Sequence, residues 1–156
     1  MSLPPLSPLP ELLQACAERA DQGLAVALAD QGNALENCSA GLRDALRRVT
    51  AVSDFVTEQL LREPQLLLDG QFVELLQREL AAGELRAQLQ AQLAGCDDED
   101  DLGRRLRRFR SRQQVRIIWR DVTRQAALVQ TCRDLSDMAD ACIDLAYQWI
   151  YPRHIA

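Results

Sequence analysis

The sequence predicts an all-α fold, a bundle of about six to eight helices joined by short loops. Leu and Ala dominate the apolar residues, and aromatic residues make up only 4% of the chain, a composition that favours helices over sheets. Between Glu11 and Tyr151 the only proline is Pro64, so long helices are permitted there. No alternating apolar and polar run is long enough to predict a strand.

Prolines, glycines and capping residues divide this helical tract. Ser53 is expected to cap the third helix, and Pro64 fits the first turn of a short helix that ends near Gly70. The acidic run 97–101 is expected to open an arginine-rich helix, because acids stabilise a helix N-terminus. Thr131 and Asp134 match a capping box at the start of the last helix. The other predicted helices span 8–30, 39–48, 53–63, 72–82 and 84–94, and 32–39 is predicted to be a turn region.

The last helix carries a heptad pattern, in which the members of one position recur every seven residues. Small residues occupy the alternate positions, which is typical of closely packed helices, so the two cysteines are expected to be buried. One heptad position holds Leu128, Leu135, Cys142 and Trp149. The alternate position holds the small residues Cys132, Ala139 and Ala146. Asp137, Asp140 and Asp144 share another face, which is expected to meet the arginine-rich helix if the two helices fold back on each other.

Residues 103–124, GRRLRRFRSRQQVRIIWRDVTR, hold nine of the eighteen arginines, and the chain has no lysine. Arg112, Arg116, Arg120 and Arg124 are four residues apart, so on a helix they form one guanidinium stripe. Arginine pairs bidentately with carboxylate or phosphate. Two interpretations remain open: the stripe pairs with carboxylates of its own protein, or it contacts a further domain or an acidic partner.

Aromatic residues gather near the end of the chain. Tyr147, Trp149 and Tyr151 either complete a core or pack against something that this chain does not contain, and their position favours an interface. The predicted interdomain or partner contacts are therefore Arg112, Arg116, Arg120, Arg124, Tyr147 and Tyr151.

Several functional classes are disfavoured. The net charge of −5 and the scarcity of aromatic residues argue against nucleic-acid binding, and no apolar run approaches the roughly 20 residues that span a bilayer. Five cysteines without CxxC spacing, after a start that lacks a signal segment, predict reduced thiols in the cytoplasm. His154 is the only histidine, and no nucleotide-binding or nucleophile motif occurs. We therefore predict no catalytic, cofactor-binding or metal-binding residue in this segment.

Three segments resemble the N-terminal helical region of the bacterial glutamine synthetase adenylyltransferase and adenylyl-removing enzyme family. They are the arginine-rich stretch 103–124, the serine-capped VTAVSDFVTEQ of 49–59, and TCRDLSDMADACIDLAYQWIYPRH of 131–154. Together they cover a little over a third of the chain. The arginine block and the run Leu-Ser-Asp-Met-Ala-Asp at 135–140 are the most specific parts.

The resemblance implies a cytoplasmic regulator of nitrogen assimilation. The family attaches AMP from ATP to a tyrosine of glutamine synthetase and removes that AMP by phosphorolysis, with Mg²⁺ required and the PII signal protein as a partner. Its paired catalytic aspartates have no counterpart here, because the chain stops at Ala156, where the family would enter its nucleotidyltransferase domain. We expect residues 1–156 to be a single N-terminal helical domain with a proline-rich lead-in at 1–10.

Two alternatives remain. A stand-alone helical protein-interaction module would be self-sufficient as a monomer or dimer. An arginine-helix nucleic-acid binder would show an affinity that falls steeply as salt rises.

Overall fold

The computed structural model describes residues 8–155, and all regular elements in that range are helical. The predicted all-α fold is confirmed. Most of the proline-rich lead-in, residues 1–7, lies outside the described residues. The described helices are α1 (Glu11–Ala29), η1 (Leu35–Asn37), α2 (Ala40–Val52), α3 (Asp54–Arg62), η2 (Pro64–Leu67), α4 (Gly70–Gln77), α5 (Glu84–Leu93), α6 (Glu99–Val122) and α7 (Leu128–His154), of which η1 and η2 are short 3-10 helices.

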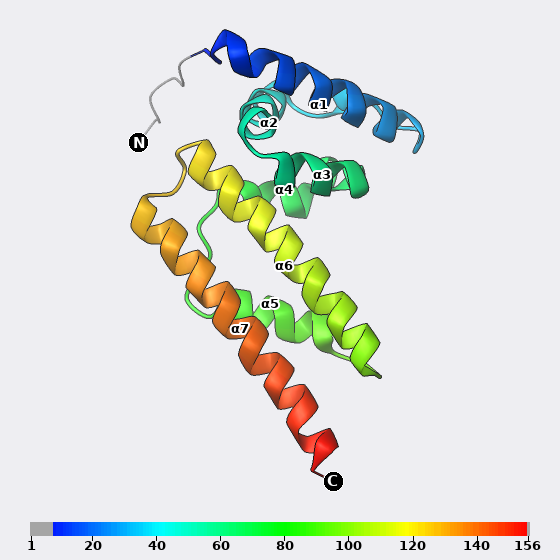
Figure 1. Ribbon diagram of the computed structural model, residues 1–156, viewed down its shortest axis with the longest axis vertical. Helices are drawn as coiled ribbons and strands as arrows, with labels where there is room; N and C mark the ends of the chain where they lie inside the picture. Colours follow the sequence, from blue (N-terminus) through cyan, green and yellow to red (C-terminus); the bar gives the residue numbers. More distant parts are fainter. Residues whose placement is uncertain (1–7, 156) are drawn as a thin grey trace.

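Helix α6 is the central element of the fold. It packs against α2, α3, α4, α5 and α7, whereas α1 covers α2 and α3 at one end of the molecule. Figure 1 shows α7 running back alongside α6 and continuing to the opposite end, where the C-terminus lies. The arginine-rich segment is therefore positioned to contact most of the other helices.

Two hydrophobic clusters lie on either side of α6. The first joins α1–α4 to the last turns of α6, where Val115 and Trp119 are almost fully buried. The second joins α5, α6 and α7 around Phe109, Ile117 and Met138. Burial of one such large side chain contributes about 1.5–3 kcal/mol. Because both clusters include side chains of α6, this helix holds the two ends of the molecule together.

Side-chain caps define several helix starts. The Ser53 hydroxyl accepts a hydrogen bond from the Val56 amide at 3.3 Å, so the predicted cap of α3 is confirmed. Asp69 and Asp98 cap α4 and α6 in the same way. Pro64 occupies the first turn of η2, as predicted. Local capping chemistry therefore accounts for these boundaries.

The predicted capping box at Thr131 is wrong. Helix α7 already begins at Leu128, and the Thr131 hydroxyl donates to the Asp121 carboxylate at 3.1 Å. The chain reverses through 123–127, where Arg124 adopts a left-handed φ of 56°, so the helix restarts earlier than the pattern indicated. The prediction for 72–82 was also too long, because the backbone is extended at Arg78, directly after α4.

Only part of the predicted heptad of α7 packs on the rest of the fold: Cys142 is half-buried against the cluster of α5, α6 and α7, and Trp149 is also half-buried. The buried residues of α7 are Asp134, Met138, Ala141 and Leu145. Cys132, which was expected to be buried, is exposed, and Leu135 is 41% exposed. The helix is rotated so that the face carrying Asp134 enters the core, because Asp134 there meets a buried arginine.

Candidate functional site

The predicted arginine stripe lies along α6 and ends beyond it. Arg112, Arg116 and Arg120 are spaced one turn apart within α6, whereas Arg124 follows the helix and is exposed. Arg116 and Arg120 are only 1% and 3% exposed. The stripe therefore passes from a half-buried position into the protein interior and out again.

The interior part of the stripe is organised by one carboxylate. Asp134 of α7 accepts a hydrogen bond from Nη1 of Arg116 at 2.8 Å, and its Oδ2 lies 4.0 Å from Nη1 of Arg120. Arg120 also donates to the backbone carbonyl of Gln125 at 3.2 Å. Burial lowers the pKa of Arg116, and the nearby Asp134 opposes that effect. This cluster fixes α7 and the α6–α7 turn to α6.

The half-buried part of the stripe pairs with α3. Arg112 donates from Nη2 and Nε to Glu63 at 2.6 and 3.2 Å, and Arg108 donates to the same oxygen at 3.3 Å. Burial of Glu63 opposes its ionisation, but the hydrogen bond and charge of Arg112, joined by those of Arg108, outweigh it and lower the pKa of Glu63. Two arginines thus tie α6 to the residue that ends α3.

Arg105 binds the end of α5. Its guanidinium donates to the backbone carbonyls of Gln92, Ala94 and Gly95 at 2.8, 3.1 and 3.4 Å. Gln92 lies in the last turn of α5, where carbonyls are left unpaired and the helix dipole favours a cation, and Ala94 and Gly95 directly follow the helix. Arg105 therefore caps α5 from a different helix.

As expected, a carboxylate of the last helix meets the arginine stripe, but that carboxylate belongs to Asp134. Asp144 instead pairs with Arg86 of α5 at 2.9 Å. Sequence reasoning treated Asp134 as a cap. One signal that could have identified it is its spacing from Met138, Ala141 and Leu145, which repeats at four and three residues and marks it as a core position.

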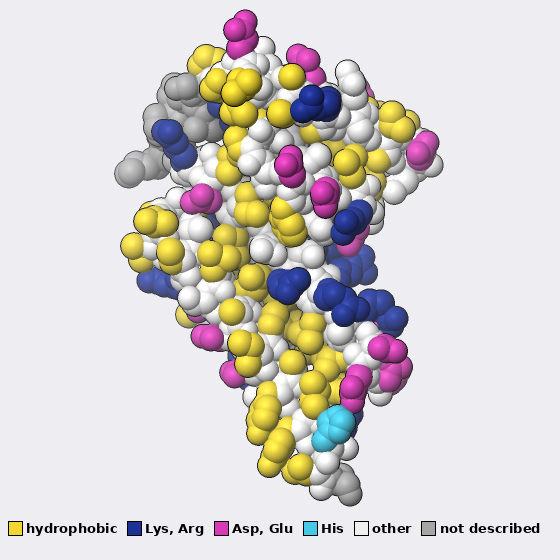
Figure 2. Space-filling view, viewed as in Figure 1, with side chains coloured by type: hydrophobic (Ala, Val, Ile, Leu, Met, Phe, Trp, Pro, Cys, Tyr) yellow, Lys and Arg dark blue, Asp and Glu magenta, His cyan; other side chains and the backbone are white. Residues whose placement is uncertain are grey.

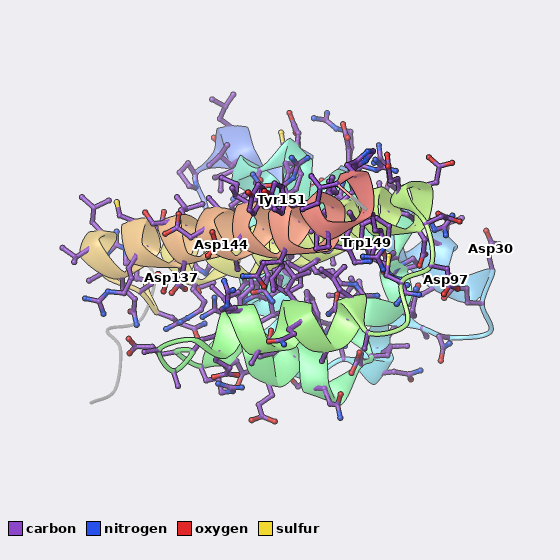
Figure 3. The ribbon with its side chains drawn as sticks, turned by 90° about the horizontal axis from the view of Figure 1, so that it is seen from below. Asp30, Asp97, Asp137, Asp144, Trp149 and Tyr151 are labelled. Carbon is purple, nitrogen blue, oxygen red and sulfur yellow. The ribbon has the colours of Figure 1, made fainter. Side chains whose placement is uncertain are left out.

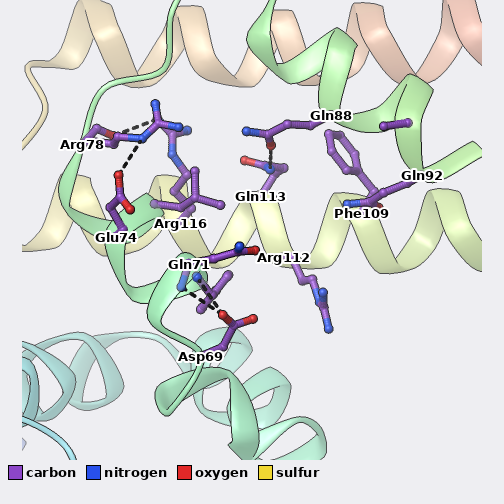
Figure 4. Close-up of a pocket in the computed structure, with 13 residues that line it drawn as sticks. Asp69, Gln71, Glu74, Arg78, Gln88, Gln92, Phe109, Arg112, Gln113 and Arg116 are labelled. Carbon is purple, nitrogen blue, oxygen red and sulfur yellow. Dashed lines mark hydrogen bonds and ion pairs between the residues drawn. The ribbon is translucent and has the colours of Figure 1, made fainter.

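A groove of about 560 Å³ lies between α4 and α5, with α6 as its floor (Figure 4). Phe109, Gln113 and Arg116 form the floor, and Gln113 donates to the side chain of Gln88 at 3.0 Å. Arg112, which also borders the groove, is neutralised by its pair with Glu63. The lining therefore offers amide and aromatic groups more than an uncompensated positive charge.

The C-terminal aromatic residues divide between two sides of α7. Tyr147 and Tyr151 are 59% and 48% exposed, and their rings stack with centroids 5.1 Å apart. Trp149 reaches from α7 toward the loop near Asp97, where its indole donates to the Cys96 carbonyl at 3.3 Å (Figure 3). The structure thus separates the exposed tyrosines from the tryptophan, which contacts the fold.

The described part of the chain offers neither a metal-binding cluster nor a membrane-spanning helix. Within residues 8–155, no group of three or more His, Cys, Asp or Glu side chains is arranged to hold a metal ion. Among the helices of that same range, none has an apolar stretch long enough to cross a membrane.

These features define a helical packing segment whose arginines are used mainly to join its own helices. The model of the glutamate-ammonia ligase adenylyltransferase family matches residues 43–156, and the chain belongs to this family. The resemblance found in the sequence is thereby confirmed.

Relatives named bifunctional glutamine synthetase adenylyltransferase/adenylyl-removing enzyme match nearly the whole chain. Those from Pseudomonas syringae pv. tomato and Pseudomonas aeruginosa are 54% and 56% identical over 99% and 98% of this chain. The one from Pseudomonas putida is 48% identical over 99% of it. The chain spans only 16% of the length of each of these relatives. No solved structure matches the chain.

Proposed function

We propose that this chain is the non-catalytic N-terminal helical segment of a longer enzyme that attaches AMP to a glutamine synthetase tyrosine and removes it by phosphorolysis. The observation that carries the proposal is the 54–56% identity across almost the whole chain to enzymes named for both activities. The chain corresponds to 16% of the length of those relatives, and in this proposal the remaining polypeptide carries the chemistry.

In this proposal residues 1–156 form one helical domain that supports the nucleotidyltransferase domain of its own chain. ATP and Mg²⁺ are assigned to that nucleotidyltransferase domain, as the resemblance to the family implies. Glutamine synthetase and the PII signal protein are the proposed protein partners, and the cytoplasm is the proposed location.

The proposed contacts with another domain or partner concern the accessible members of the predicted set. Arg124, Tyr147 and Tyr151 are exposed, and Arg112 keeps a side-chain exposure of 28%. Arg116 and Arg120 are buried with partners inside the chain, so their support is indirect: they hold α6 and α7 in place. Charge reversal at those two positions would test folding rather than a contact.

The test uses the complete polypeptide of the source gene and purified glutamine synthetase. We expect it to transfer AMP from labelled ATP to glutamine synthetase and to release that AMP when phosphate is supplied. Deleting residues 1–156 is expected to impair AMP removal more than AMP attachment, because the resemblance implies that the family's N-terminal nucleotidyltransferase domain, next to this segment, is the one that removes AMP. A complete polypeptide with neither activity would refute the proposal.

A matched pair of variants addresses the contact itself. Arg124→Glu is expected to slow AMP removal with an unchanged melting temperature. Arg62→Glu, on α3, is the control, since its side chain is 69% exposed and only a 3.6 Å surface pair with Glu58 is lost. Equal rates for both variants and the parent would remove Arg124 from the proposed contact. A gene that ends after Ala156 would favour the alternative, a stand-alone interaction module.

A further inference from the structure

Helix α7 has a second apolar face that nothing in the described structure covers. Leu128, Val129, Ile143 and Tyr147 are between 59% and 74% exposed, and Ile150 is 37% exposed. Figure 2 shows hydrophobic side chains gathered along α7. We define the outer face of α7 as Leu128, Val129, Cys132, Leu135, Ala139, Ile143, Ala146, Tyr147 and Ile150. Exposed apolar residues on α1, such as Leu12 and Val26, are separated by several helical turns.

The outer face is also free of charge. At about 100° per residue, its members fall on one side of the helix, well away from the buried side that contains Asp134 and Met138. The charged residues between 128 and 150 all lie elsewhere around the helix: Arg133, Asp134, Asp137, Asp140 and Asp144. A face that stays in water has no reason to exclude charge over six turns, so this pattern indicates that the face is buried in the functional protein.

The spacing of the outer face fits an α-helix as the covering element. Leu128 and Leu135 are seven residues apart, and Cys132, Ala139 and Ala146 place small side chains at the alternate heptad positions. Alternation of large and small residues at heptad spacing lets a second helix approach closely and insert its own side chains. The first half of the predicted heptad therefore faces outward, whereas Cys142 packs against the cluster of α5, α6 and α7 and the Trp149 indole donates to the Cys96 carbonyl.

The area of the outer face indicates what kind of partner covers it. From residue 128 to 150 a helix runs about 33 Å, and a strip roughly 10 Å wide gives about 300 Å² for each partner. Stable association of separate chains needs about 800 Å² for each partner. A covalently connected segment needs less, because its effective concentration reaches about the millimolar range. The relatives extend far beyond the matched region, since it makes up only 16% of their length.

We propose that a helix of the polypeptide following residue 156 packs on the outer face of α7. The inference rests on the proposed function, in that this chain is continued by a longer enzyme. The covering helix presents large apolar residues to Cys132, Ala139 and Ala146, and a basic residue near Asp140, which borders the face.

One native cysteine on the outer face, Cys132, provides the test. Cys132 is exposed and Cys142 is half-buried, whereas Cys16 lies on α1 and is half-buried. We expect N-ethylmaleimide to label Cys132 in the 156-residue chain and to label it at least about tenfold more slowly in the complete polypeptide, measured by peptide mass spectrometry. The labelling rate of Cys16 is expected to be the same in both proteins.

A substitution on the face separates coverage from other causes of slow labelling. Ile143→Glu in the complete polypeptide is expected to restore rapid labelling of Cys132, while the 156-residue chain keeps its melting temperature. Val26→Glu on α1, where the side chain is 63% exposed, is the control and is expected to leave the labelling unchanged.

Two results would overturn the proposal. Cys132 could react equally fast in both proteins, or the 156-residue chain could form a dimer in which Cys132 is already protected, which would make a second copy the occupant. The assays also separate the two proposals. Protection of Cys132 in a polypeptide without activity on glutamine synthetase refutes only the proposed function, and full activity with a reactive Cys132 refutes only this inference.

Discussion

Replacing Asp134 by Asn should strongly destabilise the fold, because within residues 8–155 it is the only carboxylate that pairs with two buried guanidinium groups. The side chains of Arg116 and Asp134 are 1% and 9% exposed, and Arg120 is 4% exposed. Removing one member of a buried ion pair costs about 3–5 kcal/mol, and Asn retains the size and one acceptor, so we expect about 3 kcal/mol. At about 2–4 °C for each kcal/mol, the melting temperature should fall by roughly 6–12 °C.

The assay is thermal unfolding followed by circular dichroism at low and high salt. Asp144→Asn is the matched control on the same helix, since its pair with Arg86 lies at the surface and contributes about 0–1 kcal/mol. High salt should abolish the small destabilisation by the control substitution, whereas the destabilisation by Asp134→Asn should persist. If both variants melt within about 2 °C of the parent, the buried cluster does not stabilise the fold as argued.

Three further substitutions test individual contacts by the same melting assay. The hydrogen bonds from Arg78 hold the pKa of Glu84 at about 2, below its usual 4.5. Its contribution is therefore complete above pH 4.5 and disappears as the pH falls toward 2. Glu84→Gln should cost about 1 kcal/mol at pH 7 after screening of this partly exposed pair, and it should match the parent near pH 2. Ser53→Ala should cost about 1 kcal/mol through the lost cap of α3, and an unchanged melting temperature would contradict that role. Thr131→Ala should cost less than about 0.5 kcal/mol, because Thr131 does not cap α7; a loss as large as that of Ser53→Ala would argue otherwise.

Features set by local chemistry were predictable from the sequence. The cap at Ser53, the proline turn at Pro64 and the acidic start of α6 each depend on residues within one turn of the boundary. The start of α7 was not predictable in this way. The helix begins where the turn after α6 permits, and the backbone of Arg124 takes a left-handed conformation that no glycine signalled.

The roles of the arginines depend on neighbours that are distant in sequence. The spacing of Arg112, Arg116 and Arg120 predicted a stripe, and the structure confirms that they follow one another along α6. Spacing alone does not reveal that Glu63, forty-nine residues before Arg112, neutralises it, or that Asp134 enters the core beside Arg116. Those pairings follow from how α3 and α7 pack on α6.

The two faces of α7 explain both the success and the failure of its heptad prediction. A helix with apolar residues on more than one side can satisfy the pattern in two registers, and burial alone does not choose between them. Asp134 decides between the two registers. Only the register that turns Asp134 inward lets it neutralise Arg116 and approach Arg120. Leaving those guanidinium groups buried without a carboxylate would cost several kcal/mol. The same rotation leaves Leu128, Leu135 and Ile143 exposed, so the charge pairing that holds α7 on α6 also presents these side chains for a further element to cover.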